Sequence, residues 1–409
     1  MTGRPSSPIE CLALLAPSPE EIDLLRACLW QGAAADAAWA RWQRAVGDPL
    51  AAIRRDVSGV KGLLPLLHDG LRHGAADVAA PGLRHVLAAA YAHETLRWQA
   101  YAGLCARAFE ALASAGIAFI ALKGSALAVS TFPDPVLRHS HDIDVLIDQR
   151  DLDRAATVLH AAGFAAPRAP QPPAGQSLRL ADRAGVPVEL HTRLYRLPYY
   201  DTAQRGIWER AVRCEIAGSR VHIPSTADHL VYVIGQASCC ASRDALKWVA
   251  DAWFLIQQPT LDWTIVVEDG RLALPLAVLL GVLAEQFAAP VPPAVLERLS
   301  AAAAATDRSA QQIAITGLRA GRRGRLRDLF RAIPTWRARL TLMRWLLAPS
   351  PTALRLGEPL RYPRAWPAYY LLRPPAYVAR RIRRSWSHAR RTQFSMEGGA
   401  PSPPEGGDG

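Results

Sequence analysis

The sequence predicts an α+β protein in which helical regions flank a small mixed sheet. Residues 1 to about 115, and the chain again from Ser225, are rich in alanine and leucine, with apolar residues three and four positions apart. That spacing is typical of amphipathic helices. Between these regions lie short apolar runs, rich in β-branched and aromatic residues and bounded by glycine and proline, which predict strands.

The change in pattern also predicts the domain organisation. A chain of 409 residues, half of them hydrophobic, is long enough for two or three domains with their own cores. We expect an N-terminal helical region (1–115), a mixed core (116–224), a helical domain (225–334), an arginine-rich segment (335–395) and a disordered tail (396–409).

The elements of the mixed core can be assigned in order. A long helix ends at Gly116, and Ser225 or Thr226 caps the first helix after the core. Between these points we expect a strand (117–122), a turn and short helix (123–132), a strand (142–147), an amphipathic helix ending at Gly163, a hairpin (177–194) and a short strand (220–224).

The charge of the chain is uneven. The net charge is +12, but residues 319–391 alone hold 19 arginines and two acids. The tail segment "AYVARRIRRSWSHARRTQF" (376–394) suits an anionic partner, either a nucleic acid or a membrane surface. The alternative is a solvated basic helix that packs its apolar side chains on the protein body.

Several classes of protein are excluded or disfavoured. The six cysteines show no CxxC pair or zinc spacing, and GxSxG, HExxH and P-loop motifs are absent. The start "MTGRPSSPIE" does not resemble a signal peptide. The longest apolar run, residues 272–284, is shorter than the roughly 20 residues that span a bilayer and predicts a buried helix. We therefore expect a cytoplasmic protein.

Two aspartates stand out inside the run "DIDVLI". In a strand, Asp142 and Asp144 project from the same side while Ile143 and Val145 point into the core. Two adjacent carboxylates repel each other unless a cation lies between them. Mg²⁺ is the usual candidate, with Mn²⁺ as the other, because both accept carboxylate and phosphate oxygens. The alternative is a strand edge with two solvated acids.

The neighbouring motifs favour phosphate chemistry. Gly124 and Ser125 begin a helix after a strand, where backbone N–H groups can bind an anion, and Lys123 adds a positive charge. Downstream, Glu189 in "VPVELHTRL" supplies a third acid, with His191 on the same strand face. Together these features describe a phosphoryl- or nucleotidyl-transfer centre.

This order of elements resembles the nucleotidyltransferase superfamily with a DNA polymerase β-type core. Its pattern is an hG[GS] turn, then Dh[DE]h, then a third acid on a later strand. More narrowly, "LKGSAL", Arg138, "DIDVLI" and "VELHTRL" resemble a bacterial family of uncharacterised nucleotidyltransferases. "GLLPLLHDGL" (62–71) and "LKWVADAWFLI" (246–256) extend the resemblance to about residues 10–300.

The resemblance implies roles for individual residues. It assigns Mg²⁺ binding and catalysis to Asp142, Asp144 and Glu189. It assigns nucleotide binding to a larger set: Lys123, Gly124, Ser125, Arg138, His191, Lys247 and Asp251.

The sequence also departs from the family pattern. Lys123 replaces the usual apolar residue of the turn, Glu189 stands where many relatives carry aspartate, and Gln236 stands near a frequent histidine. These departures bear most on the role of Glu189 as a base.

The expected activity is Mg²⁺-dependent transfer of a nucleoside monophosphate from an NTP to an acceptor hydroxyl or phosphate. The resemblance suggests a sugar phosphate, a peptide or a protein as the acceptor, which the sequence leaves unidentified. One alternative is a catalytically silent nucleotide-binding adaptor that recruits nucleic acid or membrane through its basic tail. Another is a hydrolase that uses the same metal site.

Overall fold

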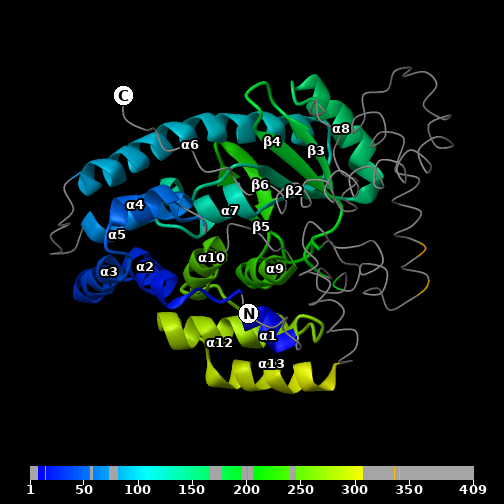
Figure 1. Cartoon of the computed structure of the whole chain (residues 1–409). Helices are drawn as coiled ribbons and strands as arrows, with labels where there is room; N and C mark the ends of the chain where they lie inside the picture. The colour runs from blue at the N-terminus through cyan, green and yellow to red at the C-terminus, as the bar shows by residue number, and fades with distance from the viewer. Residues whose placement is uncertain are drawn as a thin grey trace, which may run out of the picture.

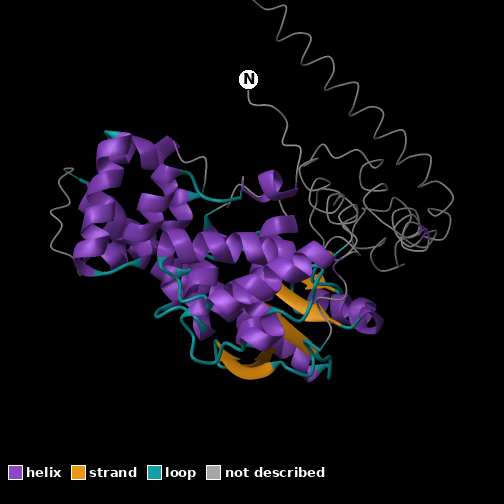
Figure 2. Cartoon of the chain, turned by 90° about the horizontal axis from the view of Figure 1, so that it is seen from below, coloured by secondary structure: helices purple, strands orange, loops and turns teal. Residues whose placement is uncertain are grey.

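A computed structural model shows an α+β architecture, with helices on both sides of a six-stranded sheet (Figures 1 and 2). It describes residues 8–13, 15–55, 59–72, 82–165, 177–195, 200, 206–239, 246–306, 336 and 340. The predicted fold class is confirmed. The arginine-rich segment and the predicted disordered tail lie outside the described residues, apart from two positions in the former.

The N-terminal region is helical, as predicted. Ser18 and Glu21 form a reciprocal capping box that starts the second helix. Gly116, with φ of +63°, follows the end of the long helix α6. The elements are α1 (Pro8–Ala13), α2 (Pro19–Leu29), α3 (Gly32–Val46), α4 (Pro49–Arg55), the 3₁₀ turn η1 (Val60–Leu63), α5 (Leu64–Arg72) and α6 (Leu83–Ser114).

The sheet has the order β3-β4-β2-β1-β6-β5. Strand β2 runs antiparallel to β1 and parallel to β4, and β1 runs parallel to β6, so the sheet is mixed. The strands are β1 (Phe119–Leu122), β2 (Ile143–Ile147), β3 (Ser177–Ala181), β4 (Pro187–His191), β5 (Val212–Ile216) and β6 (Ser219–Ile223). Between β1 and β3 lie α7 (Lys123–Ser130), the 3₁₀ turns η2 (Pro135–Leu137) and η3 (Gln149–Asp151), and α8 (Leu152–Ala161).

Strand β5 is the element that the sequence analysis missed. It pairs with β6 through a two-residue turn at Ala217 and Gly218, whose φ angles are +51° and +78°. Two positive φ angles match the twist of a tight hairpin. Strand β5 lies at one edge of the sheet, and its side chains are mostly exposed.

The two faces of the sheet pack against different helices. Alternate strand residues, such as Ile143 and Val145, pack with α6 and α8 in one core, as the alternation predicts. The opposite face, which includes Leu122 and Leu146, joins a second core shared with the N-terminal and C-terminal helices. Figure 1 shows α6 on one side of the sheet and the C-terminal helices on the other.

The chain returns to helices after the sheet. The Ser225 side chain accepts a hydrogen bond from the Asp228 N–H and so caps the first of them. The elements are α9 (Thr226–Cys239), α10 (Lys247–Ile256), α11 (Trp263–Val266), α12 (Ala273–Phe287) and α13 (Pro293–Ala305). The apolar run forms most of α12, and all of the leucines of this helix except Leu274 are buried. Among the described residues, no helix has both the length and the apolar character needed to cross a membrane.

Candidate active site

The turn after β1 brings the backbone of α7 close to the loop that precedes β2. Lys123 begins α7 directly after the strand and has a φ of +37°, which is strained for a residue with a side chain. A Cβ on Gly124 would lie 3.0 Å from the Ser140 hydroxyl and 3.2 Å from the Tyr101 hydroxyl. Glycine therefore permits a close approach at this point.

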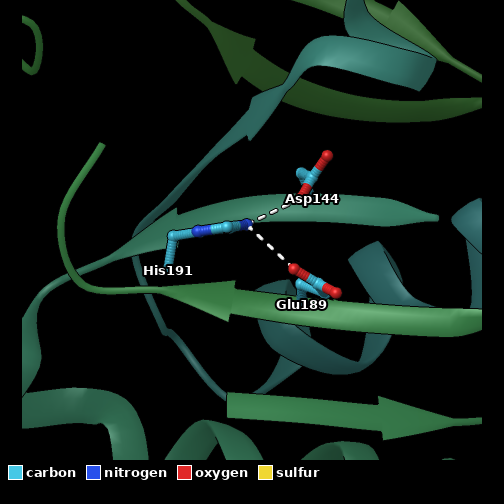
Figure 3. A group of neighbouring side chains, drawn as sticks. All are labelled: Asp144, Glu189 and His191. Atoms are coloured by element: carbon cyan, nitrogen blue, oxygen red, sulfur yellow. Dashed lines mark hydrogen bonds and ion pairs between the residues drawn. The ribbon is translucent and has the colours of Figure 1, made fainter. Parts of the chain in front are cut away.

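Three of the predicted side chains form a compact group on the sheet face opposite α6 (Figure 3). Asp144 and Glu189 are register partners on the parallel strands β2 and β4, and His191 lies two residues beyond Glu189. The His191 Nε2 is 2.6 Å from an Asp144 oxygen and 3.7 Å from a Glu189 oxygen. One ligand atom from each residue lies within 4.8 Å of the others.

The charges around this group differ between its two acids. Burial opposes ionisation of Asp144, but the Lys123 ammonium, 3.4 Å away, and His191 outweigh it and hold its pKa well below the usual range. Burial and the nearby Asp144 charge raise the pKa of Glu189. The arrangement therefore combines one firmly ionised carboxylate with one that protonates more easily.

Asp142 occupies a different position from Asp144. It lies in the bend before β2, and its backbone carbonyl accepts a 2.7 Å hydrogen bond from the Tyr101 hydroxyl. Its carboxylate is 23% exposed, with the His141 Nε2 3.6 Å away, whereas the Asp144 side chain is fully buried. Asp144 thus belongs to the buried group, whereas Asp142 lies beside it, at a cleft.

The cleft, of about 280 Å³, lies between the turn after β1, the loop before β2, and helices α9 and α10. Aromatic and apolar walls come from Tyr232 on α9 and Trp248 on α10. Six of the ten predicted site residues line it: Lys123, Gly124, Arg138, Asp142, Lys247 and Asp251. Ser125, a further predicted residue, has a fully buried side chain that does not reach the cleft.

Arg138 and Asp251 are bound to each other. The Arg138 guanidinium donates to both oxygens of the Asp251 carboxylate, at 2.7 and 2.8 Å, and to the Ser140 hydroxyl at 3.0 Å. Both side chains are at most 10% exposed. This bidentate pair joins the loop before β2 to α10, so the charge of each group is paired with that of the other.

Lys123 connects the cleft to the buried acids. It lines the cleft, contacts Asp144, and lies 5.6 Å from the centre of the Tyr232 ring. Lys247 also lines the cleft, next to Gly62. Two of the three lysines of the chain therefore face this space, where a polyanionic substrate would find positive charge.

The structure adds residues that the sequence analysis did not select. Glu94, Arg97 and Tyr101 project from α6 and bind the loop before β2 through His139, the Ser140 carbonyl and the Asp142 carbonyl. The sequence gives no clear signal for them, because α6 also carries other charged side chains, such as Arg107 and Glu110. The burial of Glu94 and its contact with His139 become visible only in the structure.

The buried group suits a divalent cation. Two carboxylates and the Nε2 of His191 converge, with one ligand atom from each residue within 4.8 Å of the others. Oxygen ligands suit Mg²⁺, and an added imidazole suits Mn²⁺ and other transition metals. The residues present therefore fit the kind of metal that the sequence predicts.

The chain is similar to a family of proteins and to one solved structure. A family model described as "Uncharacterised nucleotidyltransferase" matches residues 56–284, more than half of the chain. The chain is also similar to the crystal structure of an antigenic nucleotidyltransferase-like protein from Paracoccidioides brasiliensis. That match has 20% identity and a TM-score of 0.33, and covers 48% of this chain and 95% of the other. No curated protein matches. The matched residues include the turn after β1, the acidic group and the cleft-lining helices α9 and α10, and the chain belongs to the family of uncharacterised nucleotidyltransferases.

Proposed function

We propose that this nucleotidyltransferase is Mg²⁺-dependent and transfers a nucleoside monophosphate from an NTP to an acceptor hydroxyl or phosphate, releasing pyrophosphate. The acceptor classes we favour are a sugar phosphate, a peptide and a protein side chain. The observation that supports this proposal is the position of Lys123. Lys123 contacts the buried Asp144 and also lines the cleft, so the candidate metal site and the cleft are adjacent.

The acids would hold the metal. Asp144 and Glu189 converge with His191, and Asp142 adds a partly exposed carboxylate two residues from Asp144. A divalent cation bound there would neutralise charge on phosphate oxygens. Asp144 is suited to this because its carboxylate stays ionised at neutral pH.

The cleft would bind the nucleotide. Lys123 and Lys247 offer ammonium groups to the phosphates, and the backbone of Gly124 in the first turn of α7 adds N–H donors. Tyr232 and Trp248 provide apolar surface in the same cleft, which suits a base or ribose.

The test is a calorimetric titration with each of the four NTPs, with and without Mg²⁺. The wild type is compared with a double variant, Asp142→Asn and Asp144→Asn, which keeps side-chain shape but removes both charges. Asp148→Asn is a matched control, because it removes an exposed acid just after the same strand. We expect Mg²⁺-dependent binding of one or more NTPs in the wild type and the control, and its loss in the double variant.

Transfer is tested with the NTP that binds, by measuring pyrophosphate release. Binding without release by the wild type, whatever acceptor class is added, would favour a silent nucleotide-binding protein. Release of pyrophosphate with water as the acceptor, undiminished by competing acceptors, would favour a hydrolase.

A further inference from the structure

A second carboxylate and histidine pair lies on the cleft side of the site, away from the acidic group of β2 and β4. The His139 Nδ1 lies 2.9 Å from a Glu94 oxygen, and the Glu94 residue is 5% exposed on α6. His139 lines the cleft, and its side chain is 30% exposed. The pair therefore reaches from a buried helix face to the open space where the nucleotide would bind.

Hydrogen bonds hold the Glu94 carboxylate of this pair in one position and favour its ionised form. The Arg97 Nε donates to both Glu94 oxygens at 3.0 Å, and Arg97 also binds the Ser140 carbonyl. Burial opposes ionisation of Glu94, but hydrogen bonds from His139 and Arg97 outweigh it and lower its pKa. An anionic, immobile carboxylate fixes the imidazole as the tautomer that carries its proton on Nδ1.

The other edge of the imidazole is directed away from Glu94. Its Cδ2 lies 3.9 Å from the Cβ position of Gly62, which is also 3.2 Å from the Lys247 Cε. Among the described residues, no hydrogen-bond partner contacts the Nε2 of His139. A neutral imidazole whose Nδ1–H is bound to a carboxylate presents Nε2 as a proton acceptor.

Glu189, which the sequence suggests as the base, is placed differently. It lies on β4 beside Asp144 and His191, within 3.5 Å of Arg179, and does not line the cleft. Its position suits a metal ligand better than a group that meets an incoming acceptor.

We propose that His139, oriented by Glu94, is the general base that accepts the proton of the attacking acceptor hydroxyl. This inference rests on the proposed nucleotidyl transfer and deepens it. The acceptor oxygen forms a bond to the α-phosphorus, and its proton moves to the Nε2 of His139. The bond from the α-phosphorus to the bridging oxygen breaks, and its electron pair leaves with pyrophosphate. The imidazolium is then paired with Glu94 and releases its proton to solvent.

The charged and titratable groups that surround His139 come from three elements. They are Glu94 and Arg97 on α6, Arg138, His141 and Asp142 in the loop before β2, and Lys247 on α10.

The first experiment reads the tautomer of His139 by ¹⁵N NMR, with its signal assigned as the one missing from His139→Gln. We expect a protonated Nδ1 and an unprotonated Nε2 in the wild type, and loss of this preference in Glu94→Gln. A wild-type Nε2–H tautomer would overturn the proposal. This readout needs neither nucleotide nor acceptor, so it is independent of the proposed function.

The second experiment measures pyrophosphate release from the bound NTP with Mg²⁺, in the presence of the acceptor class (sugar phosphate, peptide or protein) that supports release by the wild type in the transfer assay. General bases contribute about 10²–10⁴-fold to rates. We expect His139→Gln to slow release by that order, to leave the calorimetric affinity for the NTP unchanged, and to remove the acid limb of the pH–rate profile. Glu94→Gln should also slow release and leave the calorimetric affinity for the NTP unchanged. The exposed His160 on α8 supplies the control variant His160→Gln, with wild-type rates expected.

The outcomes separate the two proposals. A wild-type rate in both His139→Gln and His139→Asn would overturn the base and leave the transfer reaction standing. Loss of NTP affinity in folded His139→Gln would make His139 a binding residue and also overturn the base. A wild type that binds no NTP would overturn the proposed function, and the role of His139 with it.

Discussion

The ion pair between Arg138 and Asp251 gives the sharpest test of how the site is built. The resemblance to the family implies that both residues serve the nucleotide, whereas the structure binds them to each other. If the pair is structural, removing Asp251 should destabilise the whole protein. If Asp251 serves only the nucleotide, its removal should weaken binding and leave stability unchanged.

The magnitude follows from the burial of the pair. The two side chains are 10% and 8% exposed, so water screens them little. Removing one partner of a buried ion pair costs about 3–5 kcal/mol, because the other charge stays buried without compensation. Asp251→Ala leaves the Ser140 hydroxyl as the hydrogen-bond partner of the Arg138 guanidinium among the described residues. Replacing both residues, as in Arg138→Met with Asp251→Leu, is often close to neutral.

Urea unfolding followed by circular dichroism measures these differences. With a slope of about 3 kcal/mol per molar urea, a loss of about 4 kcal/mol lowers the midpoint by about 1.3 M. We expect this shift in Asp251→Ala and a midpoint near that of the wild type in the double variant. Asp148→Ala, which breaks an exposed pair with Arg150, should leave the midpoint unchanged. An Asp251→Ala protein with wild-type stability and lost NTP affinity would refute the structural reading.

Three further predictions concern stability. Burial and the nearby Arg138 charge lower the pKa of His229 to about 3, so this histidine is neutral when folded and charged when unfolded below pH 6.5. Its contribution to the free energy of unfolding is complete above pH 6.5 and falls by about 1.4 kcal/mol per pH unit toward pH 3. His229→Gln should remove this slope. Equal dependence of the unfolding free energy on pH in both proteins would contradict this. Gly70→Ala should lower the free energy of unfolding by at least about 1–3 kcal/mol, because the new Cβ would lie 2.5 Å from the Ala27 carbonyl of the adjacent helix. Gly124→Ala should cost less than Gly70→Ala, because its new Cβ would meet side-chain atoms at 3.0–3.2 Å, and it should weaken NTP binding. Gly103→Ala, with open space around it, should be neutral or stabilising. Equal urea midpoints for the three alanine variants would count against the packing argument.

Local sequence patterns predicted most of the fold. The change from helical to alternating periodicity placed the sheet, and the positions of Gly116 and Ser225 placed the helix boundaries on either side of it. Strand β5 was missed although its sequence, VRCEI, alternates apolar and charged residues with the period of two expected for a strand. The strand has only five residues, and the glycine of the turn that follows, Gly218, was the second signal.

The candidate site could be predicted only where the chain itself brings residues together. Strand geometry puts Glu189 and His191 on one face, and parallel pairing adds Asp144. Periodicity could not show that Asp142 would leave the strand, because the bend is set by a contact from Tyr101, 41 residues away. The partnership of Arg138 with Asp251 spans 113 residues and depends on how α10 packs. Such contacts follow from tertiary structure, which local patterns do not encode.

The position of Asp142 therefore depends on α6 as much as on the sheet. Strand β2 begins at Ile143, so the ladder hydrogen bonds do not fix the residue before it. The Tyr101 hydroxyl fixes the Asp142 carbonyl, Arg97 fixes the Ser140 carbonyl, and Glu94 fixes His139. These three residues lie three and four positions apart, which places them on one face of the helix. Helix α6 thus has two roles. Its apolar side chains pack on the sheet, and Glu94, Arg97 and Tyr101 fix the position of the loop that faces the cleft. A variant that shifts α6 should accordingly disturb the chemistry of the site before it unfolds the sheet.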